Sequence, residues 1–83
     1  MKYTDGRLVV VGDRVRLSED QCGTVVCSMD ADEYTREYPR SAWRYLNSGV
    51  LVKTDEGELF HYDEPDEDFE LIARGRKALK KST

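Results

Sequence analysis

Hydrophobic and polar positions alternate early in the chain with the period of two that marks a half-buried β-strand. Residues 14–17 read Arg-Val-Arg-Leu, so we expect Val15 and Leu17 on the core side of a strand and the two arginines outside. Residues 24–29 are rich in β-branched side chains and predict a second strand behind a glycine. The core candidates of this second strand, expected on one face, are Val25, Cys27 and Met29.

A tight hairpin is predicted in the second half of the chain. Residues 50–54 and 58–62 flank the sequence Asp-Glu-Gly at residues 55–57, whose glycine can take the positive φ that such a turn needs. A hairpin edge such as residues 50–54 could pair with a second copy, although Lys53 and the neighbouring acids oppose that pairing. Oligomeric state is therefore left open.

The last predicted strand completes a mainly-β pattern. Residues 69–72 predict a short strand with Phe69 and either Leu71 or Ile72 pointing inward. Five short strands without a strong amphipathic helix favour a small barrel, and 83 residues allow a single core. We expect one five-stranded SH3-like barrel domain over residues 1–73, followed by a flexible basic tail at residues 74–83.

An aromatic-rich segment at residues 30–49 interrupts the strand pattern. Pro39 suits the start of a short helix, residues 40–46 would supply about two turns, and Asn-Ser-Gly at residues 47–49 has the composition of a stop. A long structureless loop is unusual in a compact domain, so we expect a partly helical insertion, with irregular structure as the alternative. Its aromatic residues are Tyr34, Tyr38, Trp43 and Tyr45.

Two resemblances follow from these patterns. Gly-Asp-Arg-Val-Arg-Leu at residues 12–17, followed by Gly-Thr-Val-Val at residues 23–26, resembles the first hairpin of KOW-type and related SH3-like barrels, which implies a fold more than a function. The chain is also similar to a group of small uncharacterised bacterial proteins. That second likeness runs through Gly-Asp-Arg-Val, Glu-Tyr-Pro at residues 37–39, Trp43 and His-Tyr-Asp-Glu-Pro at residues 61–65. Neither resemblance implies a particular catalytic or binding residue.

Charge is divided unevenly along the chain. Residues 74–83 hold five of the 13 basic side chains and none of the 17 acids, so they carry a formal charge of +5 and residues 1–73 carry −9. An acidic body opposes nucleic-acid binding and attracts basic proteins. We therefore expect a binding module for another protein, such as an acidic adaptor or an immunity-type inhibitor of a basic enzyme.

Two segments are candidates for the protein contact surface. Tyr34, Tyr38 and Trp43 would supply anchors, although Trp43 and one tyrosine could instead only pin the insertion to the barrel. A proline-peptide groove or a methyl-lysine cage would be narrower versions of this surface, and the groove's Ala-Leu-Tyr-Asp-Tyr segment is missing. Six of the eight residues from 63 to 70 are acidic. This run could steer a basic partner, or it could be a solvated loop that only keeps the protein soluble. The acidic candidates are Asp63, Glu64, Asp66 and Glu67.

The alternative function is a KOW-like module that contacts RNA or a ribonucleoprotein. Binding of this kind depends on Lys and Arg side chains that neutralise phosphates, which the charge of residues 1–73 opposes. The residues that would carry it are Arg14, Arg16, Arg74, Arg76 and Lys77.

Other function classes have little support in the sequence. No nucleophile elbow, phosphate loop or histidine pair is present, so we expect no enzyme. His61 is the only histidine, and we expect Cys22 and Cys27 to be free thiols, so neither a metal site nor a cofactor is expected. An apolar signal segment and a run of about 20 apolar residues are both missing, which favours a cytoplasmic protein without membrane contact.

Overall fold

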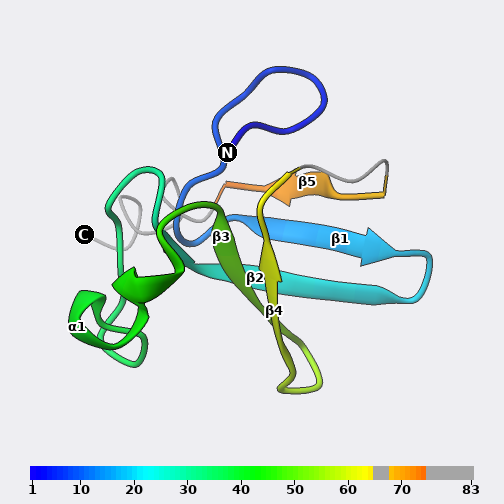
Figure 1. The fold of residues 1–83 in the computed structure, drawn as a ribbon. Helices are drawn as coiled ribbons and strands as arrows, with labels where there is room; N and C mark the ends of the chain where they lie inside the picture. Colours follow the sequence, from blue (N-terminus) through cyan, green and yellow to red (C-terminus); the bar gives the residue numbers. More distant parts are fainter. Residues whose placement is uncertain (65–67, 75–83) are drawn as a thin grey trace, which may run out of the picture.

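The computed structural model describes residues 1–64 and 68–74 and folds them around one antiparallel sheet of five strands (Figure 1). The strands are β1 (Arg14–Ser18), β2 (Gln21–Ser28), β3 (Val50–Thr54), β4 (Leu59–Tyr62) and β5 (Glu70–Ala73). Their order across the sheet is β4-β3-β2-β1-β5. From β1 to β4, strands that follow each other in the sequence are neighbours in the sheet, and β5 pairs with the free side of β1. The mainly-β prediction is confirmed. Within the described residues no pairing joins β4 to β5, so the sheet is open rather than a closed barrel.

Most of the predicted basic tail, residues 75–83, lies outside the described residues, as do residues 65–67. The described part of the chain holds no helix with both the length and the apolar character needed to span a bilayer.

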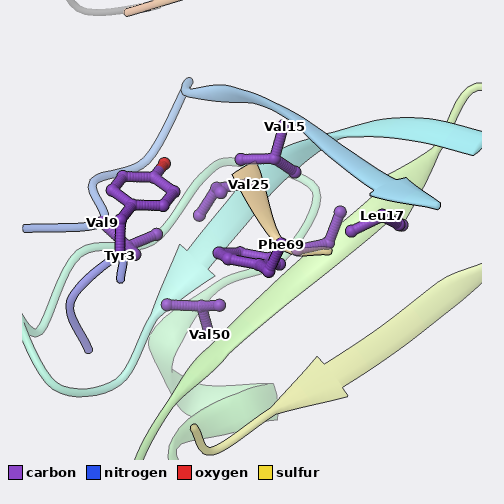
Figure 2. Packing of buried hydrophobic residues seen from close by; sticks show 8 residues of the cluster. Tyr3, Val9, Val15, Leu17, Val25, Val50 and Phe69 are labelled. Atoms are coloured by element: carbon purple, nitrogen blue, oxygen red, sulfur yellow. The ribbon is translucent and has the colours of Figure 1, made fainter. Parts of the chain in front are cut away.

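The main core lies on one face of the sheet and contains the residues that the alternation predicted there. Val15 is fully buried and Leu17 is 8% exposed, whereas Arg16 between them is exposed. Figure 2 shows the ring of Phe69 lying among the aliphatic side chains of this core. The buried members are Tyr3, Val9, Val15, Leu17, Val25, Val50, Val52 and Phe69.

Phe69 also brings the two edges of the sheet near each other. Its ring centroid lies 5.6 Å from that of Tyr3 and 5.0 Å from that of Tyr62, the last residue of β4. Leu71 packs half-buried against the main core while Ile72 is 53% exposed, so Leu71 is the inward residue of the final strand.

A β-bulge in β2 divides the core between the two faces of the sheet. Val25 pairs with Val52 and Cys27 pairs with Leu51, so the pair Val26 and Cys27 lies opposite a single residue of β3. The extra residue shifts the alternation by one position. Val25 therefore joins the main core, whereas Cys27 packs with Met29 and Leu51 in a second cluster. All three predicted residues are buried, but the prediction that they share one face was wrong.

The insertion is partly helical, as predicted. It contains helix α1 (Arg40–Trp43) and the 3-10 helix η1 (Arg44–Leu46), and Pro39 is the residue that precedes α1. The chain then turns through Asn47 at φ 70° and Gly49 at φ 83° into β3. A Cβ atom at Gly49 would lie 2.1 Å from the carbonyl oxygen of Tyr62, so only glycine fits here.

The predicted hairpin is confirmed, but its edge is not the predicted one. Residues 50–54 form β3, which lies between β2 and β4 and has no free edge. The outer strand is β4, and β5 is the edge at the other side of the sheet.

Candidate functional site

The second face of the sheet carries the insertion and brings the three predicted aromatic residues together. The buried residues Cys27, Met29 and Leu51 form a second core beneath them. This second core exists because the bulge in β2 turns Cys27 away from the main core. The residues packed half-buried against it are Val26, Tyr34, Tyr38, Trp43 and Leu46. Trp43 and the tyrosines therefore do fasten the insertion to the sheet.

Three of the aromatic rings form a row that runs outward from the second core. The centroids of Tyr38 and Trp43 are 6.0 Å apart with a tilt of 50° between the planes. Trp43 and Tyr45 are stacked, with centroids 6.3 Å apart and 26° between the planes. Tyr45 is 70% exposed, the highest fraction among the large hydrophobic side chains identified as exposed. We call Tyr38, Trp43 and Tyr45 the aromatic row.

Tyr45 was not among the predicted site residues, although the sequence shows it in the aromatic segment. Tyr45 lies in η1, just after the switch from α1 at Trp43, and its ring stacks on the indole. Composition alone gives no signal for that switch.

Polar contacts hold the base of the insertion in place. The Thr35 hydroxyl donates to the carbonyl of Val26 at 2.9 Å, and the Cys27 thiol donates to the carbonyl of Tyr38 at 3.1 Å. Thr35 and Tyr38 also bond to each other through their backbones, at 3.1 and 3.3 Å. The segment that carries the aromatic row is therefore attached to the sheet by hydrogen bonds as well as by packing against the second core.

The two thiols are expected to differ in reactivity. Both are free, but Cys27 is buried and its burial raises the pKa of the thiol to about 11, whereas Cys22 is half-buried. Because the thiolate is the nucleophile, iodoacetamide at pH 8 should modify Cys22 at least about tenfold faster than Cys27. Peptide mass mapping of the native chain measures both rates, and unfolding in urea should abolish the difference. Equal rates in the native chain would contradict the burial of Cys27 in the second core.

Asp63, the first of the predicted acidic residues, lies beside the end of the insertion. Asp63 accepts a hydrogen bond from the Ser48 hydroxyl at 3.1 Å and lies 3.4 Å from Nε2 of His61. The same His61 nitrogen lies 2.8 Å from the carbonyl oxygen of Ser48. Asp63 therefore helps to fasten the insertion to β4, while Glu64 is exposed. Asp66 and Glu67 lie outside the described residues.

The arginines predicted for nucleic-acid binding are engaged with carboxylates. Arg14 forms a bidentate pair with Asp55 at 2.7 and 2.9 Å, and this hydrogen bonding holds the pKa of Asp55 below its usual range. Arg16 lies 3.0 Å from Glu70. Arg74 lies 3.3 Å from Asp13. Phosphate binding would have to compete with these pairs. Arg76 and Lys77 lie outside the described residues.

Among residues 1–64 and 68–74, no three His, Cys, Asp or Glu side chains come together in a way that could hold a metal ion. Nε2 of His61 lies beside a carbonyl and a carboxylate, and these contacts fasten the end of the insertion to β4. In the described part of the chain, the aromatic row is therefore the strongest candidate for a functional site. Comparison of the chain with protein-family models, with curated proteins and with solved structures found no match.

Proposed function

We propose that this protein is a small binding module for another protein and that the aromatic row is its central contact surface. The observation that carries the proposal is Tyr45, a large aromatic side chain that is 70% exposed yet stacked on Trp43. A tyrosine held in position loses little conformational entropy on binding and offers a large contact area. Trp43 and Tyr38 supply the support, since both are half-buried against the second core.

The charge of the chain favours a basic partner. Residues 1–73 carry a formal charge of −9, which attracts a positively charged protein from a distance and speeds association. An adaptor, or an inhibitor that neutralises a basic enzyme or toxin, fits this combination of an acidic body and an exposed aromatic anchor.

We also infer that the open sheet belongs to the SH3-like barrel class that the first hairpin resembles. The antiparallel order β4-β3-β2-β1-β5 supports this inference, because β5 returns to pair with β1. The contact between Tyr62 and Phe69 supports it too, because it draws the two edge strands together at one end.

The alternative function, RNA binding, has less support than binding of another protein. Arg14 and Arg16 are each already paired with a carboxylate, that of Asp55 and that of Glu70. Treatment with nuclease distinguishes the two functions, because a protein complex should survive it and an RNA-bridged complex should not.

Replacing Tyr45 tests the proposal. Tyr45→Ala should weaken binding of the partner at least about tenfold, because the change removes an interface anchor. It should leave the free energy of unfolding within about 0.5 kcal/mol of the parent, because the side chain is mostly exposed. The measurement is capture of the tagged chain from lysate of its own cells, with and without nuclease, followed by titration of the purified partner.

Leu8→Ala is the matched control, since Leu8 is 58% exposed and lies outside the insertion. It should bind as the parent does. If Tyr45→Ala also binds as the parent does, the aromatic row is not the contact surface. If the captured species disappear with nuclease, the RNA alternative replaces the proposal.

A further inference from the structure

Among residues 1–64 and 68–74, β4 is an edge strand of the sheet with an unpaired outer side. The Thr54 N–H donates to the Glu58 carbonyl at 2.7 Å, which fixes the hydrogen-bonding register of the hairpin. Hydrogen-bonded pairs alternate along antiparallel strands, so Phe60 bonds to Val52 while the backbone groups of Leu59 and His61 point away from β3. Within the described residues, no other strand pairs with β4 on that side.

The side chains of β4 offer apolar contacts on both faces of this edge. Phe60 faces the side of the main core, because it pairs with Val52, and Leu59 lies on the opposite side. Both are partly exposed, at 38% for Phe60 and 36% for Leu59. A strand added beside β4 would therefore meet an apolar side chain on each face, as in known cases of strand addition.

Acidic residues flank the edge at both ends. Glu56 and Glu58 precede β4, and Asp63 and Glu64 follow it. All four are exposed. An incoming strand therefore has to bring positive charge to both of its ends in order to match this edge.

A second copy of the chain does not meet that requirement. If β4 paired with itself antiparallel, with Leu59 opposite His61, then Glu56 would lie opposite Glu64. If His61 lay opposite its own copy, then Glu58 would lie opposite Glu64. Like charges placed opposite each other in a sheet are destabilising. Self-pairing is therefore disfavoured in both of these registers.

We propose that the β4 edge binds an extended segment of a partner protein by strand addition, and that this segment has alternating apolar residues at its centre and Lys or Arg at both ends. The backbone groups of Leu59 and His61 form the new hydrogen bonds, and Leu59 and Phe60 contact the apolar centre. The flanking acids select the basic ends. The proposal does not depend on the aromatic row being a contact surface.

The test pans a displayed library of random 12-residue peptides against the full chain. Enriched peptides should alternate apolar residues between basic ends. Leu59→Pro should weaken their binding at least about tenfold, because proline removes an outward N–H that a partner strand needs. Proline is tolerated at the first residue of an edge strand, so the fold should persist, which urea unfolding checks. Leu59→Val, which keeps the N–H, is the matched control.

Two further measurements keep the proposal falsifiable if Leu59→Pro unfolds the chain. The double variant Glu56→Lys, Glu64→Lys should weaken binding of the enriched peptides at least about tenfold without altering the backbone. In the second measurement, synthetic versions of these peptides are N-methylated at one amide at a time. Methylation at every second amide should abolish binding and methylation at the amides between them should not, because only alternate amides face β4.

The proposal is overturned if no such peptides are enriched, if Leu59→Pro and Leu59→Val bind them equally in folded form, or if N-methylation shows no period of two. Tyr45→Ala should bind these peptides as the parent does. Failure at the β4 edge is therefore distinguishable from failure of the aromatic row.

Discussion

Phe69→Ala is expected to lower the free energy of unfolding by about 3–5 kcal/mol, the largest effect of any single change discussed. Phe69 is 1% exposed and its ring contacts those of Tyr3 and Tyr62, so the substitution leaves a cavity in the main core. A chain of this size has a total stability on the order of 4–12 kcal/mol, so this single change removes a large share of it. Urea unfolding followed by circular dichroism measures the change.

Phe60→Ala is the matched control for this cavity. Phe60 is the same residue type but is 38% exposed at the outer strand, so its loss should cost only about 1 kcal/mol. Equal costs for the two variants would show that Phe69 does not occupy the main core.

Asp13→Ala is expected to lower the free energy of unfolding by about 2–4 kcal/mol, because it removes the carboxylate that accepts the hydrogen bonds of a buried network. Asp13 is fully buried, and its Oδ2 accepts hydrogen bonds from the Tyr3 hydroxyl at 2.6 Å and from the Val10 N–H at 3.1 Å. Burial and the bond to Asp13 raise the pKa of Tyr3, so the hydroxyl keeps its proton. Arg74 donates to the same oxygen at 3.3 Å. Thermal unfolding of the two proteins measures the loss.

Two controls separate burial from charge in this network. Asp55→Ala removes a carboxylate that is also paired with an arginine, but this pair is exposed, so its loss should lower the stability much less than the loss of Asp13. Asp13→Asn keeps an oxygen acceptor for Tyr3 and Val10, so it should cost less than Asp13→Ala. If Asp13→Ala and Asp55→Ala lower the free energy of unfolding equally, the buried network does not stabilise the fold.

Period-two alternation predicted the strands because each strand buries one face. Val15 and Leu17 face the main core, and the glycine of the Asp-Glu-Gly turn takes a positive φ of 97° where the hairpin was predicted. These features are local, since they depend on neighbours within a few residues. The sequence therefore carried enough information to predict them.

The features that the sequence did not predict depend on distant parts of the chain. The bulge at Val26 moves Cys27 to the opposite face, and no residue in the strand marks it. Asp13 bonds to Tyr3 from the N-terminal segment and to Arg74 from beyond β5, so no local pattern predicts its burial. The exposure of Tyr45 likewise depends on how the insertion packs against the second core.

The most direct test of the central claim is photo-crosslinking from the aromatic row. A photoreactive phenylalanine analogue placed at Tyr45, and separately at Leu8 as the control, is irradiated in lysate of the protein's own cells after nuclease treatment. The account predicts one protein crosslinked in stoichiometric amount from the position of Tyr45 and none from that of Leu8, because only the first lies on the contact surface. Equal crosslinking from both positions, or no crosslinked protein from Tyr45, would contradict it.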